Sequence, residues 1–213
     1  MTHRPLSWFL GRGEVKSMDD LRGRRLAVHP PRTAPGCFAR IVLRRHGLDP
    51  DRDLQCIARF PGDYQMDLRC LRDGSIDAAY VGSTLAPEQV AHEEGFSVLS
   101  WVGDHFQIPT VGIAVDPTRI PLDSPALQAL VRANQRALRT VAEQPQLAVD
   151  YIALFLNRLT RDEVQRYYER YIGPYFTSDG RVDKNVAQHA VDAVATELGV
   201  ASPSADQMYQ PAL

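Results

Sequence analysis

The chain has 213 residues, of which 44% are hydrophobic and 23% are charged, and its formal net charge is −2. These values are those of an ordinary globular protein, and they exclude a strongly basic nucleic-acid-binding protein. No apolar run approaches the roughly 18 residues of a membrane-spanning helix. We interpret the local arginine clusters as solvated turn and helix faces (Arg22, Arg24, Arg25, Arg40, Arg44 and Arg45).

Near the start of the chain, residues 6–10 form an apolar patch that is too short for a secretory signal. We therefore expect a cytoplasmic protein as the sequence is written, or an extracytoplasmic one if an N-terminal part is missing. Cys37, Cys56 and Cys70 cannot all pair within one molecule and lack metal-ligand spacing. They indicate a reducing compartment or buried apolar roles, and no metal site.

The first elements are a short strand or hinge segment at residues 8–10 and a buried strand at 24–29. Residues 30–35 hold three prolines, which break the strand. A helix follows over 36–46, and Gly47 ends it. A strand that feeds a helix in this way directs backbone N–H groups outward at the helix N-terminus, an arrangement that binds anions.

Strands and helices then alternate at short spacing. The sequence predicts strands at 54–59, 76–81, 96–101 and 110–115, and helices at 65–72 and 87–94, with a turn at Pro61, Gly62 and Asp63. This alternation is typical of a mostly parallel, doubly wound sheet. Ligands of such sheets bind outside the carboxyl ends of the strands.

After Pro121 the pattern becomes helical. Ser124 and Pro125 begin a helix with one apolar side (Leu127, Leu130, Val131, Leu138 and Val141), and Pro145 begins another whose inward residues we expect to be Leu147, Tyr151, Ile152 and Phe155. Thr160 and Glu163 form a capping box. A last helix covers 182–198, and we expect residues 201–213 to be a loose tail.

The segments DLRGRRLAV, GLDPDRD and LRDGSIDAAYVGS, in this order, resemble a known family. It comprises the substrate-binding proteins of nitrate, sulfonate and taurine ABC transporters, including relatives that bind thiamine-pyrimidine precursors, and the similarity covers about residues 17–200. The resemblance implies an α/β protein of the type II periplasmic-binding-protein class, with a doubly wound mixed sheet and a C-terminal helical part. It implies an entry segment at 1–20, an α/β lobe at 21–115 and a helical part of the first lobe at 116–200.

The resemblance also implies a first half-lobe, usually with an export signal, before residue 17, and the sequence shows neither. In the family the late helices cover a sheet built mostly from that half-lobe. We therefore expect another chain to cover them, either a second copy, with the segment around Trp8 and the late helices at the interface, or a different partner. An ABC transporter permease is a possible further partner.

The expected ligand contacts lie in three loops. In the first, the resemblance and the helix N-terminus suggest the Thr33 hydroxyl, the Arg32 cation and the backbone N–H groups of Gly36 and Cys37 for a sulfonate, phosphate or carboxylate. The alternative is a capped helix with an exposed arginine.

In the second loop, Ser83 and Thr84 follow a strand at the same sheet edge, where they either contact the ligand or cap the helix that begins at Pro87. The third loop carries His105 and Gln107, which would lie at the floor of a cleft. The alternative for His105 is a surface or hydrogen-bonded histidine.

A catalytic alternative uses His29 or His105 as a general base, or Cys37 as a thiol with a depressed pKa at a helix N-terminus. Enzymes of this fold include a dihydroxyphthalate decarboxylase and a menaquinone-pathway dehydratase. No Cys–His or Ser–His–Asp spacing demands catalysis. His92 and Glu93 are adjacent on a helix and cannot share a face, which argues against a metal site there.

The sequence thus favours a protein that binds a small anion or a short organic acid, without a cofactor. The alternative is a cytoplasmic lyase or decarboxylase acting on an aromatic or organic acid. The third possibility is a degenerate fragment that binds no ligand.

Overall fold

The structure, a computed structural model, describes residues 3–59, 65–157 and 159–209. The turn expected at Pro61, Gly62 and Asp63 lies outside the described residues. The strands are β1 (Ser7–Gly11), β2 (Arg25–Val28), β3 (Gln55–Ala58), β4 (Ala78–Gly82) and β5 (Ser97–Trp101). The helices are α1 (Ala34–Arg45), α2 (Met66–Asp73), α3 (Pro87–Glu94), α4 (Pro125–Glu143), α5 (Pro145–Phe155), α6 (Arg161–Tyr167), α7 (Lys184–Leu198) and α8 (Ala205–Met208).

The chain divides into two compact units, each built from separate stretches of sequence. Residues 6–106 and 192–202 form the first, which we call the α/β unit. Residues 107–191, with the described parts of 1–5 and 203–213, form the second, which we call the helical unit. Helix α7 contributes its first half to the helical unit and its last turns to the α/β unit.

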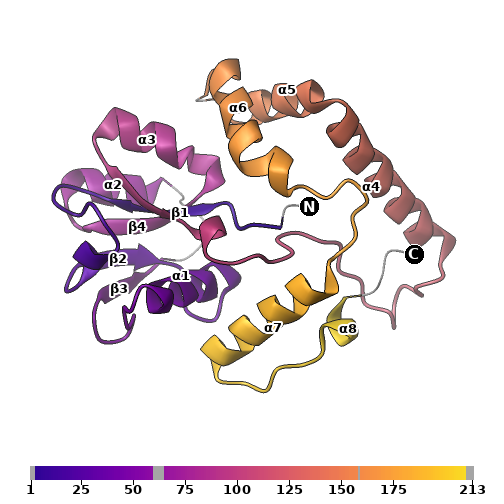
Figure 1. Cartoon of the computed structure of the whole chain (residues 1–213), viewed down its shortest axis with the longest axis horizontal. Coiled ribbons are helices and arrows are strands. Elements are labelled where there is room, and N and C mark those ends of the chain that lie inside the picture. Colours follow the sequence, from indigo (N-terminus) through magenta and orange to yellow (C-terminus); the bar gives the residue numbers. More distant parts are fainter. Residues whose placement is uncertain (1–2, 60–64, 158, 210–213) are drawn as a thin grey trace. The chain divides into compact units, whose positions relative to one another are not determined.

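All five strands belong to the α/β unit and form one sheet in the order β3-β2-β4-β1-β5. Strand β2 is parallel to both β3 and β4, whereas β1 is antiparallel to both β4 and β5. The mixed, doubly wound sheet expected from the sequence is therefore confirmed. Helix α1 lies on one face of the sheet and α2 and α3 lie on the other, as Figure 1 shows.

Strand β1 lies inside the sheet. Trp8, Phe9 and Leu10 are fully buried, which explains why this short run is apolar at every position, on both faces. The strand expected at residues 8–10 is confirmed. The expectation that the Trp8 segment would be available at a dimer interface is wrong, because Trp8 has no exposed surface.

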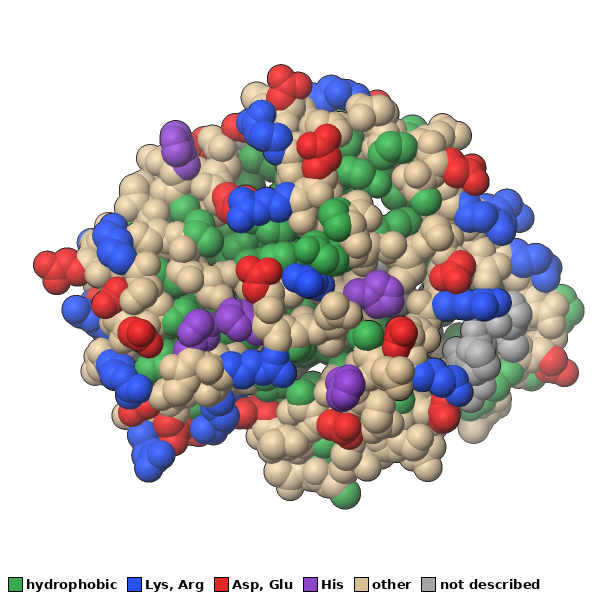
Figure 2. All heavy atoms as spheres, in the orientation of Figure 1, with side chains coloured by type: hydrophobic (Ala, Val, Ile, Leu, Met, Phe, Trp, Pro, Cys, Tyr) green, Lys and Arg blue, Asp and Glu red, His purple; other side chains and the backbone are tan. Residues whose placement is uncertain are grey.

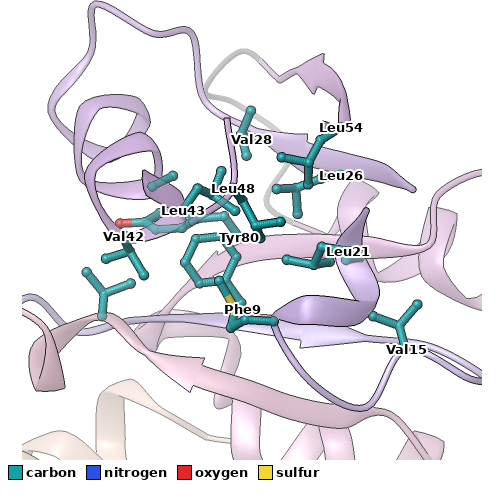
Figure 3. Close-up of a cluster of buried hydrophobic side chains, with 14 residues drawn as sticks. Phe9, Val15, Leu21, Leu26, Val28, Val42, Leu43, Leu48, Leu54 and Tyr80 are labelled. Atoms are coloured by element: carbon teal, nitrogen blue, oxygen red, sulfur yellow. The ribbon is translucent and has the colours of Figure 1, made fainter. Parts of the chain in front are cut away.

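The main core lies between the sheet and α1. Phe9, Leu26 and Tyr80 point from three neighbouring strands toward Val42 and Leu43 of α1, as Figure 3 shows. Alternate strand residues point to the opposite face, where Trp8 stacks on Trp101 with 6.3 Å between ring centroids. The buried leucines of α2 lie on that face.

Two predicted helix starts are confirmed in detail. The Ser124 hydroxyl accepts a hydrogen bond from the Leu127 N–H at the start of α4. Thr160 and Glu163 form the reciprocal capping box at the start of α6. Each cap satisfies a backbone donor that a helix cannot satisfy internally.

In the helical unit, the strand expected at residues 110–115 does not form. Those residues have no regular structure, and Val111 and Ile113 are 71% and 51% exposed. The reason is that a strand requires a neighbouring strand for its backbone hydrogen bonds. The described residues of the helical unit supply none.

Helix α5 buries a different face from the one expected. Ala148 and Val149, rather than Leu147, Tyr151 and Phe155, pack toward α6, where they meet Val164 and Tyr168. Ile152 joins this cluster, as expected. The helix is apolar on most of its circumference, so its periodicity did not identify the packed side.

Two further details of the helical unit differ from expectation. On α4, Leu127 is buried as expected but Leu130 is 47% exposed. The tail expected to be loose contains helix α8, where Ala205 is buried and its N–H donates to the Gln188 side chain. No helix in the described part of the chain is long and apolar enough to cross a membrane.

Candidate ligand-binding edge of the sheet

Four strands of the α/β unit end at one edge of the sheet. Strands β2, β3 and β4 are parallel, and β5 has the same direction because both β4 and β5 are antiparallel to β1. Neighbours β2 and β4 connect to helices on opposite faces, since α1 lies on one side and α3 on the other. Where the connections from two adjacent strands go to opposite faces, the loops after those strands diverge and leave a crevice. Open α/β sheets bind their ligands in this crevice.

Thr33 caps helix α1 at this edge. Its hydroxyl donates to the Pro30 carbonyl at 2.7 Å and accepts from the Gly36 N–H at 3.3 Å. The Cys37 N–H donates to the Thr33 carbonyl at 2.8 Å. The two amides that we expected to hold an anion therefore already make hydrogen bonds within the cap.

Gly36 has a packing role beside its capping one. A Cβ at this position would lie 2.1 Å from the Pro30 carbonyl oxygen, far inside contact distance. The first turn of α1 thus lies directly on the backbone that leaves β2. Arg32, in the same loop, is exposed and makes no ion pair with the described residues, so its guanidinium is available to an anion.

Ser83 and Thr84 follow β4 in a short 3-10 turn. Neither caps α3, because the N-cap is Ala86 and no side chain bonds to that helix start. Ser83 is half-buried and Thr84 is exposed, and neither hydroxyl bonds to a described residue. Ala86 has a left-handed backbone with φ of 48°, a strained conformation of the kind that concentrates at functional sites.

His29 lies at the carboxyl end of β2, half-buried, with its ring edge-on to Tyr80 at 6.2 Å between centroids. Its Nδ1 atom is buried and has no hydrogen-bond partner among the described residues. Burial lowers the pKa of His29, and the Asp67 carboxylate opposes part of that shift. The imidazole is therefore favoured in its neutral form.

Arg59, which follows β3 at the same edge, was not among the residues predicted from the sequence. Its Nε lies 3.2 Å from Asp67 Oδ1, and its Nη2 donates to the Cys70 Sγ at 3.2 Å. The side chain is 23% exposed. The signal was present in the sequence, since a cation that closes a predicted parallel strand lies at the carboxyl edge.

His105 lies at the other end of helix α1 from Thr33. His105 lies beside His46, which directly follows α1, whereas Thr33 precedes that helix of 12 residues. A helix of this length spans about 18 Å. Gln107 is exposed and is the first residue of the helical unit after the α/β unit ends at Phe106.

The catalytic thiol considered for Cys37 is contradicted. Cys37 is buried, and burial raises the pKa of its thiol, with the Glu197 carboxylate adding to the rise and Arg40 opposing it. A thiolate nucleophile requires the opposite shift. Among the described residues no group of three or more His, Cys, Asp and Glu side chains is arranged to hold a metal.

The arginine clusters are mostly paired with acids. Arg25 forms a two-pronged contact with Asp77, with Nη2 at 2.8 Å from Oδ1 and Nε at 3.0 Å from Oδ2. Arg22 lies 2.9 Å from Asp53. Figure 2 shows acidic and basic side chains interspersed over the face in view, without a large patch of one sign.

The arrangement of sheet, crossing helices and loop edge is that of the periplasmic-binding-protein class. The chain aligns over 99% of its length with the periplasmic aliphatic sulphonate binding protein SsuA from Escherichia coli, at 16% identity and a TM-score of 0.69. It aligns over 96% with the alkanesulfonate-binding protein SsuA from Xanthomonas axonopodis pv. citri bound to MOPS, at 14% identity and a TM-score of 0.64. It also aligns over 98% with a mutant of the desulfurization enzyme DszB in complex with biphenyl-2-sulfinic acid, at 17% identity and a TM-score of 0.66.

These likenesses confirm the fold that the sequence resemblance implied. The chain spans 69%, 70% and 74% of the lengths of those three proteins, so part of each has no counterpart here. No family model and no curated protein matches the sequence.

Proposed function

We propose that the protein is a substrate-binding component of an ABC-type transporter and that it binds a small organic anion at the carboxyl edge of its sheet. The observation that carries this proposal is the change of winding direction between the parallel neighbours β2 and β4, since the loop after β4 carries unpaired hydroxyls and the loop after β2 carries an exposed cation. The fold shared with two sulfonate-binding proteins supports the choice of a sulfonate or carboxylate.

We choose the ligand contacts from the polar groups in these loops that make no hydrogen bond or ion pair with described residues. Ser83 and Thr84 contribute hydroxyl donors, and Arg32 contributes charge-assisted hydrogen bonds. Thr33 keeps its loop in place through the cap and adds the dipole of α1. The amides of Gly36 and Cys37 contribute only if the ligand displaces the hydroxyl and carbonyl of Thr33.

A panel of small sulfonates, carboxylates and phosphate tests the proposal by thermal melting and isothermal titration calorimetry. A bound anion should raise the melting temperature in proportion to the logarithm of its concentration above Kd. Ser83→Ala and Arg32→Gln should each weaken binding about tenfold, the equivalent of one charge-assisted hydrogen bond. Thr33→Ala is less informative because it also removes a helix cap.

Ser97→Ala is the matched control, since Ser97 begins β5 at the opposite edge of the sheet. It should leave binding unchanged. A panel that leaves the melting temperature unmoved, or an affinity lost equally in Ser97→Ala and Ser83→Ala, would contradict the site. Turnover of a bound organic acid in the same mixtures would favour the catalytic alternative instead.

The partners that this function requires are also proposals. A transporter permease is the expected membrane partner. The exposed face of α5 supports contact with a second copy of the chain, since Leu147, Tyr151, Leu154 and Phe155 are 39%, 69%, 81% and 75% exposed at helical spacing. A continuous apolar surface of this kind usually marks an interface.

A further inference from the structure

Residues 111–115 of the helical unit, with the sequence VGIAV, form an apolar segment at the surface. Val111 and Ile113 are 71% and 51% exposed, and Val115 is half-buried. None of the residues in this segment makes a backbone hydrogen bond to a described residue. Exposed N–H and C=O groups beside apolar side chains are a template for pairing with another chain.

The residue types in this segment are those of a strand. Valine and isoleucine, which are branched at Cβ, favour strands. Since successive side chains of a strand point to opposite faces, Val111, Ile113 and Val115 would share one face, and Gly112 and Ala114 the other. The described residues of the helical unit contain no strand that could pair with this one. A second polypeptide chain would supply the missing neighbour.

The segment is also symmetric about Ile113. Pro109 and Pro117 bound it, each four positions from Ile113. Proline cannot donate a hydrogen bond to a strand ladder, so a ladder usually ends at such a residue. When two copies of the segment run antiparallel, the one register that pairs all residues between the prolines places Ile113 opposite Ile113. Every other register sets a proline of one copy against the ladder of the other.

We propose that residues 111–115 pair antiparallel with the same residues of a second copy of the chain, about a twofold axis at Ile113. Val111 of each copy then lies opposite Val115 of the other, an apolar cross-strand pair of the kind that stabilises antiparallel strands. The segment carries no charged side chain, so no like charges face each other within it. The inference rests on the second copy named in the proposed function, but not on anion binding or on the α5 face.

The prolines also indicate which backbone groups bond across the pair. In an antiparallel ladder, residues alternate between positions whose N–H and C=O groups bond to the opposite strand and positions whose groups point away from it. Pro109 and Pro117 fall on the same alternation as Ile113 and lack an N–H, so they fit the second kind of position. The bonded residues are then Gly112 and Ala114, with Gly112 of each copy opposite Ala114 of the other. A two-stranded ribbon is only marginally stable alone, so we expect a weak contact that a covalent trap can capture.

The test is cysteine cross-linking of the full chain that carries Cys56→Ser and Cys70→Ser, which remove the thiols that are not buried. Opposite Cβ atoms of an antiparallel pair lie about 4.5–5.5 Å apart, so Ile113→Cys should form a disulfide between two copies under mild oxidation. Val111→Cys is the matched control. Its two thiols would lie about 14 Å apart along the ladder, beyond the reach of a disulfide, so it should cross-link at least about tenfold more slowly.

Ala114→Pro, added to Ile113→Cys, should lower the rate of cross-linking about tenfold, because each copy loses a hydrogen bond of the ladder. The Ala114 N–H makes no hydrogen bond to a described residue, so the thermal melt of the single chain should not change. The two cysteine variants change exposed side chains, so their comparison stays decisive if Ala114→Pro folds poorly.

Equal cross-linking of Ile113→Cys and Val111→Cys would overturn the pairing, whether or not sedimentation shows a dimer through α5. An Ile113→Cys chain that stays unlinked would also overturn it and would favour a strand from a different polypeptide as the occupant. Anion binding, measured by calorimetry in the same variants, should equal that of the parent chain. Failure of the pairing and failure of the proposed function are therefore read from separate measurements.

Discussion

The Arg40 guanidinium on α1 donates to the Glu197 carboxylate at the end of α7, with 2.6 Å between Nε and Oε1. The two residues are 157 positions apart in sequence, and their side chains are only 14% and 5% exposed. Arg40 also pairs with Asp51. This contact joins the last part of the α/β unit to its first helix.

We predict that Glu197→Gln lowers the free energy of unfolding by about 1–3 kcal/mol, because it weakens hydrogen bonds to a mostly buried cation. Urea unfolding measures the change. Arg52→Gln is the control, since the Arg52 side chain is 81% exposed where it pairs with Asp49, and the expected loss is below about 1 kcal/mol. Equal effects of the two substitutions would mean that the Arg40 contact adds little.

Gly36→Ala should destabilise the protein by about 2 kcal/mol or more, because its Cβ would meet the Pro30 carbonyl oxygen at 2.1 Å. Gly82→Ala is a fair comparison, since nothing lies within 4 Å of a Cβ there and its φ of −91° suits any residue. That variant should change stability by less than about 0.5 kcal/mol. Thermal melts of both variants measure the cost of this close approach, and equal melting temperatures would contradict the prediction.

The Arg25–Asp77 pair predicts a pH dependence of stability. Hydrogen bonds from Arg25 lower the pKa of Asp77 below its usual value of 3.8. A carboxyl with a depressed pKa stabilises the fold at pH values above its usual pKa. This stabilisation is lost as the pH falls through the folded-state pKa. The difference in stability between the parent chain and Asp77→Asn should therefore be full at pH 7 and shrink below about pH 4.

Asp123→Asn, an exposed position in the helical unit, serves as the reference for that titration. The free energy of unfolding of this variant should equal that of the parent chain at every pH. A parent-to-Asp77→Asn difference that stays constant down to pH 2 would show that the pair makes no charge-dependent contribution.

Tyr80→Phe should leave the stability unchanged or raise it. The Tyr80 hydroxyl is buried and makes no hydrogen bond of ordinary geometry to the described residues, although the Ser7 side chain lies near enough to influence it. Burial raises the pKa of Tyr80 to about 12. Since an unpaired buried hydroxyl costs about 1–3 kcal/mol, its removal costs nothing. A clear loss of stability would instead reveal a bound water or ligand as its partner.

The apolar face of α5 predicts self-association. Sedimentation velocity should show a dimer at micromolar concentration, and Leu154→Gln should shift it toward monomer, because that side chain is 81% exposed in the single chain. Met66→Gln changes an exposed methionine on α2 and should leave the proportion of dimer unchanged. A chain that stays monomeric with a cooperative melt would exclude the second copy as the partner of this face.

The sequence was most informative where local signals and burial agree. Strands β2 and β4 were recognised because short apolar runs end in turn residues, and the capping box of Thr160 and Glu163 specified the start of α6 locally. The antiparallel insertion of β1 between β4 and β5 was not predictable, since pairing over about 70 residues leaves no local signature.

The site was predictable only in part, for the same reason. The positions of Thr33 and Ser83 follow from strand ends, which periodicity locates. Whether the Gly36 amide is free depends on the Thr33 rotamer, and whether His105 reaches the site depends on the path of the chain after β5. Periodicity also failed on α5, where nearly every side of the helix is apolar.

The discontinuity of the α/β unit has a consequence for how the protein is made. All five strands have been synthesised by residue 101, yet the helical turns that carry Glu197 follow only after most of the helical unit. At translation rates of about 5–20 residues per second, that delay is on the order of ten seconds. During this interval the sheet and α1 emerge without one of the carboxylates that hold Arg40. The α/β unit, whose strands are made before the helical unit, can therefore be completed only after most of the helical unit has been made.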